Sequence, residues 1–465
     1  MPTVLQQDIY ESARDEYDQM LIEITNGHIL RSKTVNYQSA EKHSKYFLNL
    51  EKKRAINNTI KRLCINTDNS VETTNGQTII KEIKKFYEKL YSTSTSETPQ
   101  SCSQFLEDIN LPTLTAEEIN FLNQPITIED LESSIKKSKN GKSPGSDGLT
   151  REFYIVFWND VKQLLYNSLI YAKHIGELSN TQRQAVIKLL DKGKDKRYIK
   201  NLRPISLMNY DAKILHKALA DKLREVLSSL ISPDQTAYIK ERFLGESVRL
   251  ISDVLEISNT YNVEGYILTV DIEKAFDSVE HQFLFKTLEK FGFNGYFLEW
   301  IKILLKNQQS CVLNGGVSTG FFPLQRGSRQ GDPISAYLFI LVIEVLFNMV
   351  KENANLNPLK IFETDFLLTS YADDTTFFLK DLNSAKAIFK TFSTFTKFAG
   401  LKVNKSKCQI AGIGVKNGVQ VALSEVQSID LSNEYIKILG VYFTYNEEIF
   451  LEKTSVKLSK KLKTF

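Results

Sequence analysis

Cysteine is scarce in this sequence of 465 residues, which has only four, and they lie far apart. No two of them have the short spacing of zinc ligands, and a chain of this size does not depend on a disulfide framework. We therefore expect reduced thiols in an intracellular protein. The four residues are Cys64, Cys102, Cys311 and Cys408.

Long apolar runs and a secretory signal are also lacking. The longest apolar stretch, residues 334–347, is too short to span a bilayer and contains Glu344. The N-terminus, MPTVLQQDIYESARDEY, is polar and acidic, which excludes a signal peptide. With 42% hydrophobic and 25% charged residues, the composition is that of a globular protein with a substantial core. We expect no membrane partner.

A large excess of positive charge is lacking as well, because the formal net charge is only +4. Nucleic-acid binding must therefore rest on local basic clusters. One cluster, YQSAEKHSKYFLNLEKKRAINNTIKRL, lies in a stretch (8–65) that we expect to be mostly helical. Cations for phosphates mixed with rings for bases are typical of a nucleic-acid surface, but a solvated basic helix explains the same pattern. The candidate residues are Lys52, Lys53, Arg54, Lys61 and Arg62.

Two adjacent carboxylates lie in the middle of residues 366–379, FLLTSYADDTTFFL. Runs rich in Phe, Leu and Thr on both sides predict a β-hairpin with Asp373 and Asp374 at its tip. Adjacent like charges repel unless a cation neutralises them, so the pair indicates a metal site. A solvated turn is the alternative, because Asp is common in turns.

A third carboxylate, Asp271, follows a predicted buried strand at residues 266–270. Acids at the exit of a buried strand are often catalytic in α/β and α+β enzymes, whereas a helix cap explains a lone Asp as well. Carboxylates are the ligands that hard cations prefer, so a site shared by three of them would suit Mg²⁺.

Other elements follow from periodicity and from turn residues. Asp332 and Pro333 are expected at the N-cap and first position of a buried helix. The loop GKSPGSDG, residues 141–148, could cradle phosphate with Lys142 or simply turn the chain. The remaining predictions are helices at 128–138, 211–230 and 384–399, a strand at 185–190, and a hairpin at 309–324.

In order along the chain, these motifs resemble the reverse transcriptases of non-LTR (LINE-type) retrotransposons. GKSPGSDGLT is similar to the segment before the fingers, and NLRPISLMNYDAKILHKALADKL to the fingers motif. VDIEKAFD resembles palm motif A, RQGDPISAYLF motif B, YADD motif C, GLKVNKSKC motif D, and ILGVYF the primer grip. Seven such segments in the same order over about three hundred residues make the resemblance specific.

The resemblance implies an α+β right-hand polymerase fold, with an antiparallel palm sheet packed on helices, fingers, and an N-terminal helical extension. It also implies a fragment that lacks the endonuclease and most of the thumb and C-terminal region. The Ser/Thr-rich stretch 91–103 is expected to be an exposed linker. The expected parts are a basic extension (1–65), a linker with a small helical segment (66–125), fingers (126–260), palm (261–435), and primer grip with the start of the thumb (436–465).

The implied activity is RNA-directed DNA synthesis, which extends a DNA primer 3′-hydroxyl on an RNA template with dNTPs. Two Mg²⁺ ions, or Mn²⁺, would supply the charge neutralisation that phosphoryl transfer needs. Their implied ligands are Asp271, Asp373, Asp374 and the carbonyl of Ile272. Glu273 and Asp277, by contrast, are expected to be structural or solvated.

The resemblance also assigns nucleotide-binding residues. Arg203 and a lysine would grip the triphosphate; which of Lys188, Lys192 and Lys194 does so stays open, because the segment LLDKGKD is one residue shorter than the family pattern. Phe276 would exclude a 2′-hydroxyl, or else be one more core aromatic. Gln330 would contact the nucleotide or template base, and Lys405 or Lys407 would protonate pyrophosphate unless it is merely a surface lysine. Further contacts to nucleic acid are expected from Lys142, Arg329, Leu439 and Gly440.

Two rivals remain open from the sequence. One is a catalytically inactive, reverse-transcriptase-like RNA-binding scaffold or decayed transposon copy, and the other is an RNA-templated RNA polymerase. The expected partners are an RNA template, a DNA primer or target, and dNTPs. By family resemblance the protein would act as a ribonucleoprotein in the nucleus or the cytoplasm.

Overall fold

The computed structural model describes residues 59–65, 71–423 and 426–453. The expected helix over residues 8–58, including Lys52, Lys53 and Arg54, lies outside the described residues. Within them, helix up to residue 65 is wrong, because Leu63–Cys64 (β1) pairs antiparallel with Glu72–Thr73 (β2). Lys61 and Arg62 precede β1 and are exposed.

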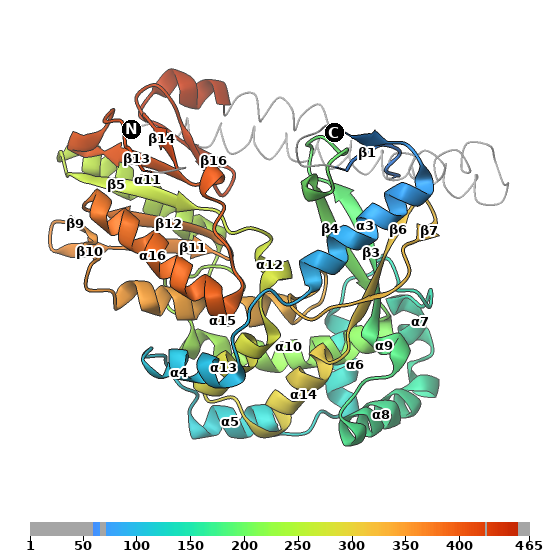
Figure 1. Ribbon diagram of the computed structural model, residues 1–465. Helices are drawn as coiled ribbons and strands as arrows, with labels where there is room; N and C mark the ends of the chain where they lie inside the picture. Colours follow the sequence, from blue (N-terminus) through green and yellow to red (C-terminus); the bar gives the residue numbers. More distant parts are fainter. Residues whose placement is uncertain (1–58, 66–70, 424–425, 454–465) are drawn as a thin grey trace, which may run out of the picture.

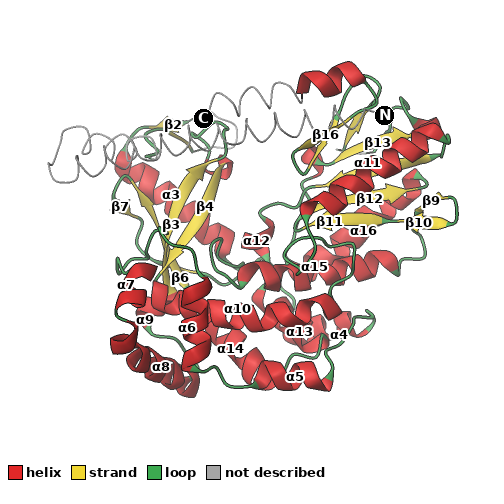
Figure 2. Cartoon of the chain, turned by 180° about the vertical axis from the view of Figure 1, so that it is seen from behind, coloured by secondary structure: helices red, strands yellow, loops and turns green. Residues whose placement is uncertain are grey.

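The described chain is a mixed α+β structure with several small sheets, of which the two largest stand on opposite sides above a layer of helices (Figure 1). Figure 2 shows the same arrangement from behind, with the helices gathered below both sheets. In the described part of the chain, no helix is long and apolar enough to cross a membrane. All four cysteines are free thiols, as expected.

The first sheet has the strand order β11-β12-β5-β13-β14. Its pairs are antiparallel except β13–β14, which is parallel, so the expectation of an antiparallel sheet holds for all but this edge. The hairpin predicted at 366–379 is confirmed as β11 and β12, and the buried strand before Asp271 as β5. The strands are β5 (Gly265–Val270), β11 (Leu368–Tyr371), β12 (Asp374–Leu379), β13 (Gln409–Ile413) and β14 (Gln427–Ile429).

Apolar side chains cover both faces of this sheet, which explains why β5 reads as a continuous apolar run. Ile267 points into a core shared with Leu244–Thr260 (α11), and Leu268 into the larger core shared with Ser335–Lys351 (α15) and Leu382–Ala399 (α16). α15 is buried nearly all round, as its composition predicts.

The second sheet has the order β4-β3-β6-β7, with β8 also paired to β6. β3 pairs antiparallel with β4 and parallel with β6, so strands from both sides of the expected boundary at residue 260 share one sheet. The long helix α3 (Gly76–Tyr91) packs on it through Ile79, Ile83 and Tyr87. The strands are β3 (Gln184–Asp191), β4 (Leu202–Met208), β6 (Gln309–Asn314), β7 (Val317–Ser318) and β8 (Phe322–Pro323).

The remaining elements are the other helices, two small hairpins and three short 3₁₀ turns. Helices predicted at 128–138 and 211–230 are confirmed as α6 and α10. The helices are α4 (Pro99–Glu107), α5 (Ala116–Asn123), α6 (Ile128–Lys137), α7 (Arg151–Val156), α8 (Trp158–Ile175), α9 (Asn180–Arg183), α10 (Tyr210–Leu230), α12 (Ala275–Ser278), α13 (His281–Lys290) and α14 (Gly295–Leu305). The small hairpins are β9 (Leu359–Ile361) with β10 (Thr364–Phe366), and β15 (Ile436–Ile438) with β16 (Val441–Phe443); short 3₁₀ turns lie at Ile199–Asn201, Lys405–Lys407 and Gly414–Lys416.

The stretch expected to be an exposed linker, 91–103, is exposed over most of residues 92–100, but the linker part of the expectation is wrong because α4 begins within it. Thr98 caps α4 through a reciprocal capping box with Ser101, and Cys102 of that helix is buried. Upstream, the Thr93 hydroxyl and the Ser94 backbone N–H donate hydrogen bonds to the Glu280 carboxylate, at 2.7 and 2.8 Å. Ser and Thr are common in linkers, but here their hydroxyls fix the chain to the core.

The expected start of α15 at Asp332 is also wrong, because the helix begins at Ser335. One oxygen of Asp332 accepts a hydrogen bond from the Ile334 backbone N–H, and the other lies 2.8 Å from Nδ1 of the buried His216. Burial acts to raise the pKa of Asp332, but the charge and hydrogen bond of His216 lower it. Asp332 therefore fixes the loop before α15 to α10.

Candidate active site

The three expected carboxylates come from two neighbouring strands. Val270, the last residue of β5, pairs with Thr375 of β12, so Asp271 and Asp374 leave the same edge of the sheet side by side. Asp373 is in the turn between β11 and β12. The strand register thus brings together residues that are about one hundred positions apart in sequence.

A buried glutamine holds the turn in place. Ala372 has φ of 58°, in the left-handed region that costs energy for residues other than Gly. Gln235 Oε1 accepts a hydrogen bond from the Ala372 backbone N–H at 2.9 Å, and Gln235 Nε2 donates to the Ala372 carbonyl at 3.2 Å. Gln235 is fully buried and pairs alongside Ser370. Sequence reasoning missed this residue, because a single Gln after the Pro233 turn carries no pattern.

The carboxylates repel one another in a partly desolvated site. Burial, and then the charge of Asp271, raise the pKa of Asp373. Burial and the charges of Asp373 and Asp271 raise the pKa of Asp374 to about 6. The Asp374 side chain is still exposed, so we expect solvent to screen part of this repulsion. Carboxyls held in this way are stabilised by any cation that binds between them.

Lys407 supplies one positive charge to the site. Its Nζ lies 2.8 Å from Oδ2 of Asp271, and the Asp271 carbonyl accepts a hydrogen bond from the Asn404 N–H, also at 2.8 Å. Both side chains remain partly exposed, 53% for Lys407 and 34% for Asp271, so a ligand could displace this pair. Lys407 is therefore a candidate lysine that forms an ion pair with an expected metal ligand.

The backbone of Ile272 is oriented toward the carboxylate hairpin. Ile272 forms an antiparallel bridge with Val403, in which the Asp271 carbonyl and the Glu273 N–H make the hydrogen bonds. Alternate residues of a strand direct their N–H and C=O groups to opposite sides, so the Ile272 carbonyl points away from Val403 and toward the side of β12. The role of this carbonyl as a metal ligand stays a prediction.

A small cleft of about 110 Å³ joins the site to the chain's last described hairpin. Asp271, Asp374, Lys407 and Leu439 all line it. Leu439 and Gly440 form the two-residue turn between β15 and β16, and both have positive φ, 51° and 81°. Such a turn favours glycine, which explains Gly440 but not Leu439.

The donor set fits a hard cation in its chemistry, since it consists of carboxylate and carbonyl oxygens. The side chains are not arranged as a complete metal site, however. Among the described residues, no three His, Cys, Asp or Glu side chains are grouped closely enough to hold a metal ion. At Asp271, the carboxylate is engaged by Lys407.

The ring of Phe276, five residues after Asp271, is half-buried. Phe276 lies in α12, and its ring centroid is 4.5 Å from that of Phe339 in α15. Its carbonyl accepts a hydrogen bond from the Ser328 N–H at 2.8 Å. One side of the ring thus packs on the core while part of it stays accessible, a position compatible with contact to a ligand.

Basic residues of the second sheet share its exposed face. Leu190 pairs with Arg203 and Lys188 with Ile205, so Lys188 and Arg203 project from the same face. Lys192 follows two residues after Leu190. Burial and the positive charges of Arg203 and Lys407 lower its pKa, and its own charge acts on Asp373. The charge of Lys192 therefore acts together with that of Arg203 and reaches Asp373.

The segment around Gln330 lies against β4. The Gln330 carbonyl accepts a hydrogen bond from the Ser206 N–H at 2.8 Å, and a Cβ on Gly331 would approach the Ser206 carbonyl to 2.9 Å. The Gln330 side chain is half-buried. Arg329 does not fit its expected contact to nucleic acid, because it is only 1% exposed and its guanidinium donates to the carbonyls of Arg183 and Gln309.

Lys142 is exposed, in the loop that precedes α7. Residues 141–148 form no helix or strand, so their conformation agrees with the interpretation of this loop as a simple turn of the chain. Its role toward phosphate stays a prediction.

Comparison with known proteins gives one matching family and several relatives. A family model described as "Reverse transcriptase (RNA-dependent DNA polymerase)" matches residues 191–443. The chain is 30% identical over 424 residues to the "Transposon TX1 uncharacterized 149 kDa protein" of Xenopus laevis, covering 90% of this chain and 32% of that protein.

Two further relatives come from Drosophila. The chain is 25% identical to the "Retrovirus-related Pol polyprotein from type-2 retrotransposable element R2DM" of Drosophila melanogaster, over 69% of this chain and 30% of that protein. It is 22% identical to the "RNA-directed DNA polymerase from mobile element jockey" of Drosophila funebris, over 61% of this chain and 31% of that protein. The chain therefore spans about a third of the length of the curated relatives that it matches.

Proposed function

The chain belongs to the reverse transcriptase family, within the group carried by non-LTR retrotransposons, and on this premise we propose that it is an RNA-directed DNA polymerase. It would extend the 3′-hydroxyl of a DNA primer on an RNA template, with dNTPs as substrates. The observation that carries the proposal is the strand register that brings Asp271 and Asp374 to one end of the first sheet, with Asp373 in the adjoining turn and Lys407 paired with Asp271. An RNA-binding scaffold would not need three mutually repelling carboxylates.

In this proposal the two sheets have the roles of a right-hand polymerase. The first sheet with α11, α15 and α16 is the palm, the second sheet with α3 is the fingers, and the β15–β16 hairpin is the primer grip. The cleft shared by Asp271, Asp374 and Leu439 supports this assignment, because a primer end held by the hairpin would lie next to the carboxylates.

Asp271, Asp373, Asp374 and the Ile272 carbonyl would hold two Mg²⁺ ions, with Mn²⁺ as a substitute. Bound there, the ions would activate the primer hydroxyl and stabilise the leaving pyrophosphate. For the carboxylates to act together, Lys407 must release Asp271, and its ammonium group then lies free near the site, where it can give a proton to the pyrophosphate. The raised pKa of Asp374 is consistent with a site that needs a cation.

Arg203 and Lys192 would bind the triphosphate. Arg203 projects from the exposed face of the second sheet, Lys192 follows the end of β3, and the charge of Lys192 acts on Asp373. The phosphates of a nucleotide bound between Arg203 and Lys192 would therefore be neutralised. Phe276 would lie beneath the sugar and exclude a 2′-hydroxyl by occupying its space. Gln330 would contact the base, and Lys61, Arg62 and Lys142 would contact nucleic-acid phosphates.

Primer extension on a primed RNA template tests this function. We expect DNA products with Mg²⁺ and dNTPs, none with EDTA, and none from Asp271→Asn. Binding of the RNA without extension in Mg²⁺ or Mn²⁺ would contradict the proposal and favour the scaffold. Products made from ribonucleotides at the same rate would favour an RNA polymerase instead.

A further inference from the structure

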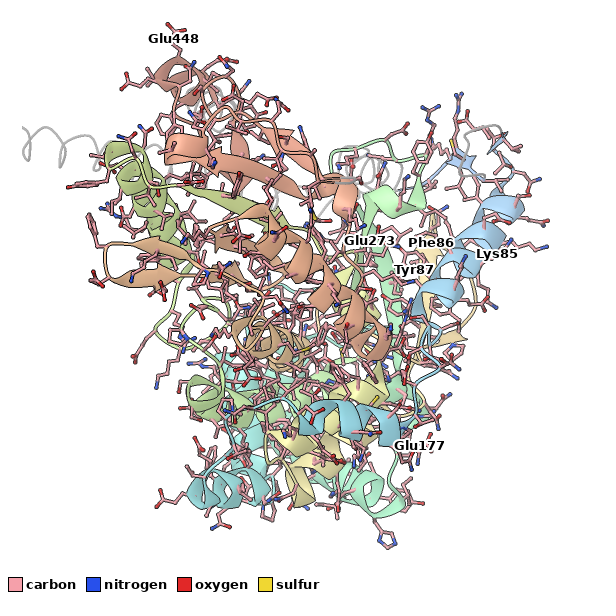
Figure 3. The ribbon with its side chains drawn as sticks, turned by 60° about the vertical axis from the view of Figure 1, so that its left-hand side comes forward. Lys85, Phe86, Tyr87, Glu177, Glu273 and Glu448 are labelled. Carbon is pink, nitrogen blue, oxygen red and sulfur yellow. The ribbon has the colours of Figure 1, made fainter. Side chains whose placement is uncertain are left out.

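Helix α3 lies outside residues 191–443, which match the family model, yet it contacts the segment that follows Asp271. Lys274, at the N-terminal end of α12, has φ of 45°, and its Nζ lies 3.9 Å from the ring centroid of Phe86 in α3. Burial lowers the pKa of Lys274 to about 8. Figure 3 shows Phe86 and Tyr87 of α3 beside Glu273, which precedes Lys274. α3 is therefore packed against the chain that carries Phe276.

Tyr91, the last residue of α3, binds two separate segments. Its hydroxyl donates a hydrogen bond to Oδ1 of Asp277 at 2.7 Å, and the two side chains are only 1% and 2% exposed. Its carbonyl accepts from the backbone N–H groups of Gln325 and Arg326, at 2.9 and 3.3 Å. Asp277 is the neighbour of Phe276 in α12, so one tyrosine links α3, α12 and residues 325–328.

Residues 325–328 pack against α12 through backbone hydrogen bonds. The Gly327 N–H donates to the Val279 carbonyl at 2.7 Å, and the Ser328 N–H donates to the Phe276 carbonyl at 2.8 Å. A Cβ on Gly327 would approach the Asp277 carbonyl oxygen to 2.4 Å, so no larger residue fits there. The backbone of Phe276 is thus held directly by residues 325–328 and indirectly by Tyr91 through Asp277.

We propose that Tyr91 is a positioning residue that fixes Phe276 and thereby sets the preference for deoxyribonucleotides. The inference rests on the proposed function, in which Phe276 excludes the 2′-hydroxyl. A ring that discriminates by occupying space must be held within a fraction of an ångström. Without the Tyr91 hydroxyl, the buried Asp277 carboxylate loses its donor, and α12 must shift to find another.

The test compares Tyr91→Phe with Tyr87→Phe. Tyr87 is also buried, lies one turn earlier on the same helix face, and stacks on Tyr91 with ring centroids 6.2 Å apart. Both variants lose one hydroxyl oxygen. The measurement is the ratio of kcat/KM for a dNTP to that for the matching ribonucleotide. This ratio is independent of the fraction of folded enzyme.

We expect Tyr91→Phe to lower this ratio by roughly fivefold or more, and Tyr87→Phe to leave it unchanged. Asp277→Asn keeps an acceptor for the Tyr91 hydroxyl, so its ratio should stay close to that of the wild type. Asp277→Ala should resemble Tyr91→Phe, and combining these two should cause no further change, because both remove the same hydrogen bond.

An unchanged ratio in Tyr91→Phe, with both rates and the melting temperature lowered together, would overturn the inference and leave Tyr91 as a packing residue. A wild-type enzyme that makes no DNA would overturn the proposed function as well. An unchanged ratio in Phe276→Val would remove Phe276 as the discriminating ring, and with it this role of Tyr91. The three failures are therefore distinguishable.

Discussion

The ammonium group of Lys407 lies 2.8 Å from Oδ2 of Asp271, so the chain's own cation neutralises the first of the expected metal ligands. A metal ion must compete with this pair.

We predict that Lys407→Met lowers the Mg²⁺ concentration for half-maximal extension by about two- to fivefold, a modest change because the pair is partly exposed. We also predict a slower maximal rate, because a proton donor is lost. Lys402→Met, which changes an exposed lysine nearby, is the control. An unchanged Mg²⁺ requirement would show that the pair does not limit metal binding.

Phe276→Val should make room for a 2′-hydroxyl. We expect the use of ribonucleotides relative to dNTPs to rise roughly tenfold or more, while dNTP use falls modestly. The comparison is single-nucleotide incorporation on one primed RNA. Phe285→Val, the same truncation of another half-buried ring, serves as the control. If Phe276 is only a core residue, its truncation costs about 1–3 kcal/mol of stability and selectivity stays the same.

Lys192 and Lys188 form a matched pair on one strand and its extension. Lys192→Ala should raise KM for dNTPs by about tenfold, because Lys192 is the lysine whose charge reaches Arg203 and Asp373. Lys188 lies four residues away, about 13 Å along an extended chain, so Lys188→Ala should change KM much less. Steady-state kinetics on homopolymer RNA would measure both. Equal effects would mean that the whole face binds nucleic acid rather than the triphosphate.

The ionised carboxylate of Asp374 lowers the free energy of unfolding, because burial and the neighbouring carboxylates raise its pKa. Its pKa is raised from 3.8 to about 6, so between these values the folded state binds more protons than the unfolded chain. Stability should then rise as the pH falls through this window. Without Mg²⁺ at neutral pH, Asp374→Asn should melt roughly one to three degrees higher than the wild type, and the difference should shrink toward pH 4. Mg²⁺ should stabilise the wild type more than the variant. A variant that melts lower at neutral pH would contradict this account.

Local patterns predicted the elements that carry the carboxylates. The runs rich in Phe, Leu and Thr around Asp373 and Asp374 predicted the hairpin, and the apolar run before Asp271 predicted β5. Both signals are local, because the apolar side chains of a strand by themselves indicate that the strand is buried. The apolar composition of α15 likewise predicted its burial.

Contacts between distant segments had no such signal. Tyr91 and Asp277 are 186 positions apart, and Gln235 and Ala372 are 137 positions apart. Both contacts depend on how the elements pack. The sequence around Tyr91 or Gln235 does not distinguish either residue from any other aromatic or polar residue. The contacts of the Ser/Thr-rich stretch with Glu280 had no local signal either, because Glu280 lies 187 and 186 positions from Thr93 and Ser94.

The most direct test of the central claim is primer extension by Asp373→Asn beside Asp365→Asn, with RNA binding measured on the same preparations. Asp365 is an exposed carboxylate of β10, so its variant makes the same chemical change away from the site. We predict that Asp373→Asn abolishes extension in Mg²⁺ while RNA affinity and melting temperature stay close to the wild type, and that Asp365→Asn extends normally. Extension by Asp373→Asn at the wild-type rate would contradict the claim that these carboxylates form the polymerase site.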